Sequence, residues 1–407
     1  MNRRDATGAP ANNDHLIGIA FGLGLAFLAA YQQFKLPVVL PVLLADYSYD
    51  RTLAGGFMSI YAFFGLFLSI PLGRAIQRHG AASLIAWALL LMVLGNGIGL
   101  FRPESGWLML TSRGLEGIAF AVLAIGGAAL ANANASPRSL PLVAGLMATW
   151  IPVGQLSATV LAPIAIATSS WRMLWYVGIG ATVLFFLWTI INRISGSVVL
   201  TPPASVATDK SGASTDITPR ERRGLILTAL LFMLWSGQYF AYMTWLPQYL
   251  VEVHGLAITQ AQWGYAIPVS LVMVVCVVTG LLLQRGLFLG TLLVSALITQ
   301  AAVWWLLPFT GGGISGIASL VAYGAGAGVV PACLFALPSV ILQRGHNTAR
   351  AFGIVMTGRN MGVLIGPVLV AQAFKMTDSW DLAAPIFGTV TSLCLVTAIL
   401  LARQLHR

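Results

Sequence analysis

The stretch ASLIAWALLLMVLGNGIGLF, residues 82–101, runs for twenty positions without a charged side chain. A helix that crosses the hydrocarbon core of a bilayer needs about 20 mostly apolar residues, because only a helix satisfies its backbone N–H and C=O groups within one segment there. Similar stretches recur along the whole chain, in which 58% of the residues are hydrophobic and 8% are charged. The sequence therefore predicts an all-α protein that lies in a lipid bilayer.

Twelve membrane-spanning helices can be delimited in this way. We expect them at 16–44, 52–72, 82–101, 106–134, 140–168, 172–195, 224–251, 260–284, 287–308, 314–342, 350–374 and 382–403. Several are longer than the hydrocarbon core, which permits tilt. The first fifteen residues are polar and the first span is too long for the core of a signal peptide, so we expect no cleaved leader.

A segment rich in Ser, Thr, Pro and Ala separates the first six spans from the last six, which is typical of a flexible linker. The predicted organisation is an N-terminal tail, a first six-helix bundle, a linker, a second six-helix bundle and a C-terminal tail, at 1–15, 16–195, 196–223, 224–403 and 404–407.

The two sets of six spans carry matching residues at separations of 206 to 208 positions. The matched pairs include Gln32 and Gln238, Phe34 and Phe240, Gly117 and Gly324, and Gly154 and Gly362. Transporters often place their binding site between two such related bundles. The nearly constant separation predicts a duplication that produced two pseudo-symmetric six-helix halves.

The net charge of +10 follows the predicted topology. With an even number of spans and both ends inside, fifteen Lys and Arg residues lie on the inner side and four on the outer side. Basic residues favour the cytoplasmic side of a membrane. We therefore expect an inner-membrane protein with both termini in the cytoplasm, and we do not expect nucleic-acid binding.

Two motifs carry a resemblance to a known family. The segment Gly73-Arg-Ala-Ile-Gln77-Arg78-His-Gly80 resembles the signature Gly-x-x-x-Asp-Arg-x-Gly of the major facilitator superfamily, in the loop between its second and third helices. The segment Arg113-Gly-Leu-Glu-Gly117 resembles the second motif of that superfamily. Within the superfamily, the segment from Gln238 to Gly255 resembles the group of cyanate and 2-nitroimidazole transporters.

This resemblance implies two bundles that rock around a central cavity and expose it to each side in turn. It also implies a cytoplasmic gate, formed here by Gly73, Gln77, Arg78 and Gly80. The aspartate of the signature is Gln77 in this chain, so we do not expect a proton-sensitive electrostatic lock there. Arg78 can still donate to the carbonyls at a helix C-terminus, which would give a weaker gate.

Four ionisable side chains fall inside predicted spans, where a charge is costly and is a candidate functional group by default. They are Lys35, Arg113, Glu116 and Arg359. None has a charged counterpart in the other half, whereas a packing requirement of the scaffold would tend to recur. Arg359 follows Arg350 by nine residues. It therefore lies about 13 Å into its helix, near the middle of a core of about 30 Å.

Residues of both halves make up the predicted site. Arg113 and Glu116 form either an intrahelical ion pair that makes both charges tolerable, or a site where Glu116 carries a proton. The symmetric amides suit either a small polar solute or hydrogen bonding between helices. The predicted substrate-binding residues are Gln32, Lys35, Arg113, Gln238, Tyr239, Tyr242 and Arg359, and Glu116 is the candidate for proton coupling.

An excess of positive charge inside the spans favours an anionic substrate. We expect a monomeric secondary transporter that moves a small organic carboxylate or inorganic anion. Symport with protons is the expected mode if Glu116 titrates, and uniport or exchange is the alternative. The alternative is proton-coupled efflux of drugs or amphipathic compounds, which favours acids over bases in the cavity. The cysteines Cys276, Cys333 and Cys394 have neither metal-binding nor disulfide spacing. We expect no metal, no cofactor and no enzymatic activity.

Overall fold

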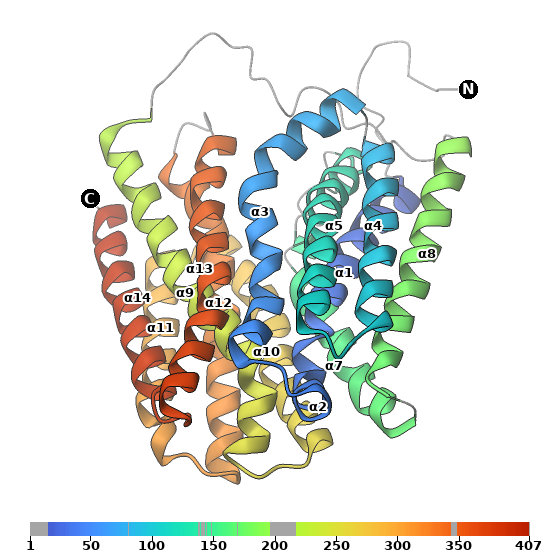
Figure 1. The fold of residues 1–407 in the computed structure, drawn as a ribbon. Helices are drawn as coiled ribbons and strands as arrows, with labels where there is room; N and C mark the ends of the chain where they lie inside the picture. The colour runs from blue at the N-terminus through green and yellow to red at the C-terminus, as the bar shows by residue number, and fades with distance from the viewer. Residues whose placement is uncertain are drawn as a thin grey trace.

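The computed structural model consists of helices and the loops that join them, without a strand in the residues that it describes. These residues are 15–79, 81–136, 139, 143, 145–147, 149–168, 170–195, 217–342 and 348–406. Figure 1 shows the helices in two groups, with α3 (Arg51–His79) and α13 (Thr348–Thr377) where the groups meet. The prediction of an all-α membrane fold is confirmed.

The first bundle begins with a broken helix. Helix α1 (Leu16–Phe34) is followed by the 3-10 turn η1 (Pro37–Val39) and the short helix α2 (Leu40–Tyr47). Pro37 has no N–H to donate to the carbonyl of Gln33, and its ring clashes with a continuing helix. The first predicted span, 16–44, is therefore present but interrupted in its last third.

In the part of the chain that the structure describes, the rest of the first bundle consists of five further helices. Besides α3, it comprises α4 (Ala81–Phe101), α5 (Gly106–Ala133), α7 (Trp150–Thr168) and α8 (Arg172–Ser195). Helix α5 packs against α1, α3 and α4, while α4 also contacts α8. Large apolar side chains such as Trp87 and Leu184 are exposed on α4 and α8. Such faces suit contact with lipid, which is as apolar as they are.

The second bundle comprises α9 (Pro219–Glu252), α10 (Ile258–Gln284), α11 (Leu289–Leu306) with the 3-10 turn η3 (Leu307–Phe309), α12 (Ile314–Ile341), α13 and α14 (Ala383–His406). Thr218 and Glu221 form a capping box around Pro219, so α9 begins five residues before the predicted span. The predicted linker, 196–223, is therefore too long at its end. Its residues 196–216 lie outside the described part of the chain.

Eleven helical segments of the described chain are long and apolar enough to cross a membrane. The remaining predicted span, 52–72, lies within α3, which has 29 residues. At about 1.5 Å per residue this helix is longer than the hydrocarbon core. It includes residues 73–79, so the prediction that this gate motif forms a loop is wrong: the segment contains no proline, and the helix ends just before Gly80. The side chains of Gln77 and Arg78, and Gly80 itself, lie outside what is described.

Equivalent glycines make equivalent helix contacts in the two halves. A Cβ on Gly117 of α5 would meet Tyr61 Cα of α3 at 3.0 Å, and a Cβ on Gly324 of α12 would meet Pro268 Cα of α10 at 2.7 Å. Both the glycines and their neighbours are separated by 207 positions. Likewise Gly154 packs on α1 and Gly362 packs on α9. The sequence repeat therefore corresponds to a repeat in three dimensions.

The two bundles meet along two helix pairs, α3 with α13 and α7 with α10. Glycines permit a close approach in the first pair, where a Cβ on Gly55 would lie 2.8 Å from the carbonyl oxygen of Pro367. Near the middle of the molecule, the rings of Phe34 and Phe240 lie 5.9 Å apart across the boundary. Residues on these helices and on α1 and α9 therefore form the boundary between the halves.

Candidate functional site

Glu116 is the centre of a buried network in the first bundle. Its Oε1 accepts a hydrogen bond from Lys35 Nζ at 3.0 Å, and its Oε2 accepts from Tyr61 OH and from Arg113 Nη1, each at 2.5 Å. The side chains of Lys35, Arg113 and Glu116 are fully buried. The intrahelical pair predicted from spacing is present, and Lys35 is a third charged member that spacing did not indicate.

Lys35 is the C-cap residue of α1, directly before the break, and it has further partners in this network. Its ammonium also donates to Gln32 Oε1 at 2.6 Å and to Asn96 Oδ1 at 2.5 Å, and it lies 4.5 Å from the centre of the Trp175 ring. An ammonium has three protons to donate. All three are matched by acceptors, so in this state Lys35 has no free donor for a substrate.

Arg113 satisfies backbone groups that the helix break leaves without partners. Its Nη2 donates to the carbonyl of Gln33 at 2.8 Å, and its Nη1 donates to the carbonyl of Gln32 at 2.9 Å. The Gln33 carbonyl has no donor four residues later, because that residue is Pro37. Arg113 thus stabilises the break in α1 in addition to pairing with Glu116.

The symmetric amides have different partners in the two halves. Gln32 donates to Gly178 O and to Thr182 Oγ1, both on α8 at 3.0 Å. Gln238 donates to Tyr323 OH on α12 at 3.1 Å, and its Oε1 is buried without a partner. Tyr242 packs edge-on against the ring of Tyr323 inside the second bundle. Both amides therefore connect helices within their own bundle.

Gln155 of α7 connects the two bundles. It accepts a hydrogen bond from Tyr239 OH on α9 at 3.1 Å and donates to Tyr265 OH on α10 at 2.6 Å. Gln155 and Tyr265 are fully buried, and neither was predicted as a site residue. The repeat maps Gln155 onto Val363, so a comparison of neutral polar residues between the halves would have found it.

Arg359 of α13 is the one charged side chain in the described spans that is buried without an ionic partner. It is 8% exposed, its Nη1 donates to Asn360 Oδ1 at 3.0 Å, and its Cζ lies 5.2 Å from the centre of the Phe240 ring. Its Nη2 has no hydrogen-bond partner. Because Phe240 contacts Phe34 across the boundary, the guanidinium lies close to the meeting surface of the halves.

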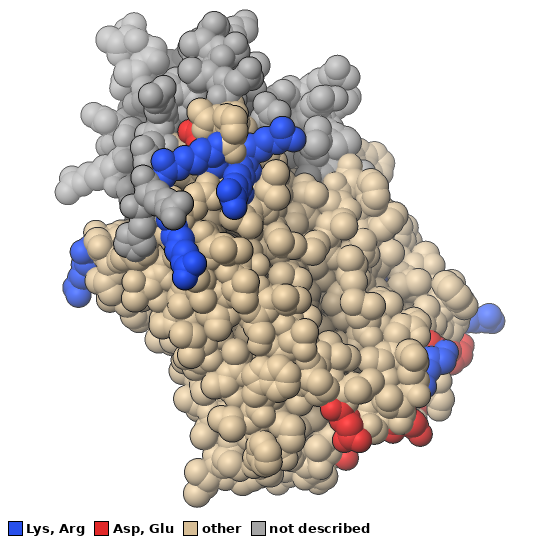
Figure 2. Space-filling model, turned by 90° about the vertical axis from the view of Figure 1, so that its left-hand side faces the viewer, with Lys and Arg blue, Asp and Glu red and all other residues tan. Residues whose placement is uncertain are grey.

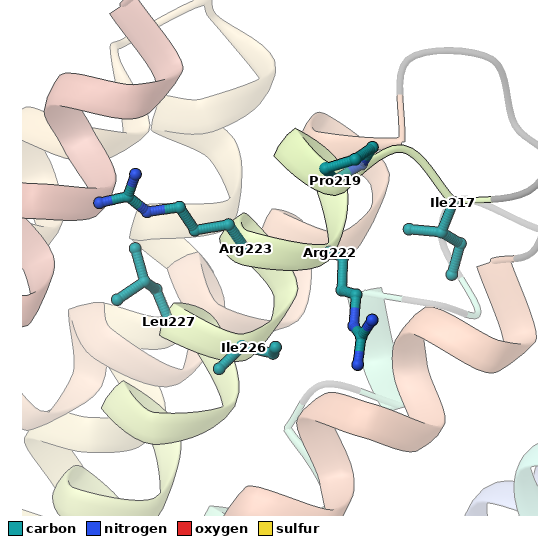
Figure 3. Close-up of a pocket in the computed structure, with 6 residues that line it drawn as sticks. All are labelled: Ile217, Pro219, Arg222, Arg223, Ile226 and Leu227. Atoms are coloured by element: carbon teal, nitrogen blue, oxygen red, sulfur yellow. The ribbon is translucent and has the colours of Figure 1, made fainter.

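Two hollows in the described structure lie apart from Arg359 and from the Glu116 network. One, of about 350 Å³, is lined by the first turns of α9, where Figure 3 shows Arg222 and Arg223 pointing to different sides of the helix. The other, of about 440 Å³, lies in the second bundle between α9, α10 and α12 and reaches Tyr242 at one end. The described residues contain no group of His, Cys, Asp and Glu that could hold a metal ion.

Comparisons with known proteins agree with this architecture. A protein of Haemophilus influenzae that is named for metabolite transport is 23% identical over 262 residues, which cover 62% of this chain and 63% of that protein. The match therefore spans less than two thirds of the length of that relative. The MFS-type transporter ppzB of Metarhizium majus is 29% identical over 106 residues, covering 26% of this chain and 23% of that protein.

A solved structure of the nucleoside transporter NupG has the same fold, with a TM-score of 0.68 at 13% identity, over 95% of this chain and 99% of that one. The sequence profile of the Major Facilitator Superfamily matches residues 22–367. With the duplicated bundles and the paired boundary helices, this match identifies the chain as a member of the major facilitator superfamily.

Proposed function

We propose that this protein moves a small anion across the inner membrane by alternating access, and that Arg359 binds the anion. The observation that carries the proposal is the buried guanidinium whose Nη2 has no partner. A buried charge is costly unless it is paired and hydrogen-bonded. A carboxylate or a small inorganic anion provides both the counter-charge and the acceptor, and arginine has donors only.

The same residues argue against an amphipathic cation as the substrate. Glu116 is the only buried carboxylate in the described residues, and Lys35, Arg113 and Tyr61 already donate to its two oxygens. A cation would therefore find no free counter-charge there. This arrangement favours anion transport over the alternative of drug efflux.

Proton coupling through Glu116 is the second part of the proposal. Protonation would remove the negative charge that neutralises Lys35 and Arg113 and would take an acceptor from one of the three donors. The network would then have to rearrange, and this rearrangement would link the proton to the position of α1 and α5. Retained coupled uptake in Glu116→Gln would exclude this role.

The distribution of charge supports the orientation with both termini in the cytoplasm. Figure 2 shows a group of Lys and Arg at the end where α9 begins, whereas the opposite end carries Asp and Glu together with fewer Lys and Arg. The exposed residues Arg220, Arg222 and Arg223 belong to the basic end. Basic residues favour the cytoplasmic side of a membrane.

The test is counterflow into proteoliposomes with labelled monocarboxylates, dicarboxylates, cyanate, a nucleoside and a lipophilic cation, with and without a proton gradient. Loss of a buried charged partner costs about 2 kcal/mol or more. We therefore expect Arg359→Gln to reduce anion uptake at low concentration by at least about thirtyfold. Arg285→Gln, which removes an exposed arginine, serves as the matched control. Unchanged anion uptake by Arg359→Gln would refute the site.

A further inference from the structure

Two ion pairs join the bundles at the end of the molecule opposite the start of α9. The guanidinium of Arg51 at the start of α3 binds both carboxylate oxygens of Glu252 at the end of α9, at 2.7 and 3.2 Å. Lys375 of α13 donates to Asp50 Oδ2, just before α3, at 2.8 Å. Each pair takes one partner from each bundle, so neither can persist if the halves separate at this end.

The Arg51–Glu252 pair is the stronger of the two, because more groups hold it. Trp380 Nε1 donates to Glu252 Oε2 at 2.7 Å, and Gln248 Nε2 donates to Oε1 at 2.6 Å. The guanidinium of Arg51 also lies 3.7 Å from the centre of the Phe374 ring. The side chains of Arg51 and Glu252 are each 27% exposed, whereas the Lys375–Asp50 pair is about half exposed and more strongly screened.

The ion pairs are not a repeated feature of the scaffold. At the separation of 206 that relates the ends of the first and seventh spans, Glu252 corresponds to Asp46, which has no ionic partner among the described pairs. The related boundary between α7 and α10 is joined by the neutral Gln155–Tyr265 hydrogen bond instead. Among the described residues, ion pairs therefore join the bundles at one of the two related boundaries and not at the other.

We propose that Asp50, Arg51, Glu252 and Lys375 form an outer latch, which holds the transporter closed at the end opposite the start of α9 and must open in every transport cycle. The latch sets the free-energy difference between this state and the state open at that end. A bidentate ion pair that forms in just one of the two states shifts the equilibrium between them by its whole interaction free energy. The inference rests on the proposed function for its orientation and its transport cycle.

The test uses Ser59, which faces α13 from α3 and donates to the carbonyl of Val363 at 3.4 Å. It lies eight residues beyond Arg51, which is about 12 Å further into the molecule. In a protein whose Cys276, Cys333 and Cys394 are replaced by serine, Ser59→Cys is labelled by a membrane-impermeant maleimide added from the latch side. No substrate is present.

We expect Arg51→Glu and Glu252→Gln to raise the labelling rate of Cys at this position about fivefold, and the exchange Arg51→Glu with Glu252→Arg to restore at least half of the difference. Arg172→Glu, an exposed charge reversal at the same end, should leave the rate unchanged. Labelling of Glu252→Gln at the parental rate would overturn the latch, and so would an exchange variant that is labelled as fast as Arg51→Glu.

The design also holds where one variant does not fold. Glu252→Gln keeps the shape of the side chain, so it decides the question if Arg51→Glu aggregates. Because the labelling needs no substrate, the proposal of the latch and the proposal of an anionic substrate are tested independently. If the labelling rates change as expected but the protein takes up no anion, the latch is supported and the anionic substrate is rejected. Anion uptake with unchanged labelling rejects the latch alone.

Discussion

Glu116→Gln tests whether the network in the first bundle is held together by charge compensation. The substitution keeps the size of the side chain but removes the negative charge between Lys35 and Arg113. Removing one partner of a buried ion pair costs about 3–5 kcal/mol, because the other charge is left buried without compensation. We expect the free energy of unfolding in detergent to fall by this amount. Glu104→Gln, an exposed carboxylate in a loop, is the control and should have no effect.

The stronger test is the double variant Lys35→Met with Glu116→Gln. It removes the unpaired ammonium, while Arg113 keeps its hydrogen bonds to the carbonyls of Gln32 and Gln33. An apolar replacement of a buried ion pair is often neutral or stabilising. We therefore expect the double variant to be more stable than Glu116→Gln alone, by about 1–3 kcal/mol. A double variant whose loss equals the sum of the single losses would refute the reasoning, because it would show that Lys35 and Glu116 do not compensate each other.

Three further predictions concern the boundaries between helices. Gly362→Ala should destabilise the fold by about 1–3 kcal/mol, since its Cβ would meet the backbone of α9. Gly280 has open space around it, so Gly280→Ala should not destabilise the fold, and thermal unfolding compares the two variants. Lys375 holds the pKa of Asp50 below its ordinary value of 3.8. The ion pair between them should therefore persist from pH 8 to pH 5 and be lost only as the pH falls through the lowered pKa. NMR titration of the Asp50 carboxyl can follow this loss. Gln155→Leu leaves two buried tyrosine hydroxyls without this partner and should change the rate of counterflow while the protein stays folded in size-exclusion chromatography.

The sequence predicted the parts of the fold that depend on local pattern and on the repeat. Apolar length defined the spans, and the constant separation between the halves correctly related the contacts of Gly154 to those of Gly362. The boundary of α9 was misplaced because the capping box at Thr218 lies in a polar segment that has no apolar periodicity. Helix α3 was predicted too short for a similar reason, since it continues beyond the hydrocarbon core.

The contacts of the site were harder to predict, because they join residues that are distant in sequence. Arg113 and Glu116 lie three residues apart, so their pairing could be read from helix geometry. Lys35 is 81 residues from Glu116, and Arg51 is 201 residues from Glu252. No local rule relates such positions. The difference between the halves marks Lys35 as unusual but does not indicate its partners. Gln155 differs from its counterpart Val363 in polarity but carries no charge, so a difference in charge between the halves does not reveal it.

The position of each polar group relative to the boundary decides what it can contribute to transport. The Glu116 network lies within one bundle, so a rocking motion moves it as a unit for as long as Glu116 stays ionised. Arg359, Gln155 and the Arg51–Glu252 pair lie at the boundary, so their surroundings differ between the two states. A ligand shifts an equilibrium only through interactions that differ between the states. For this reason the lone arginine at the boundary, rather than the better-connected charges of the first bundle, is where binding of an anion can drive the motion.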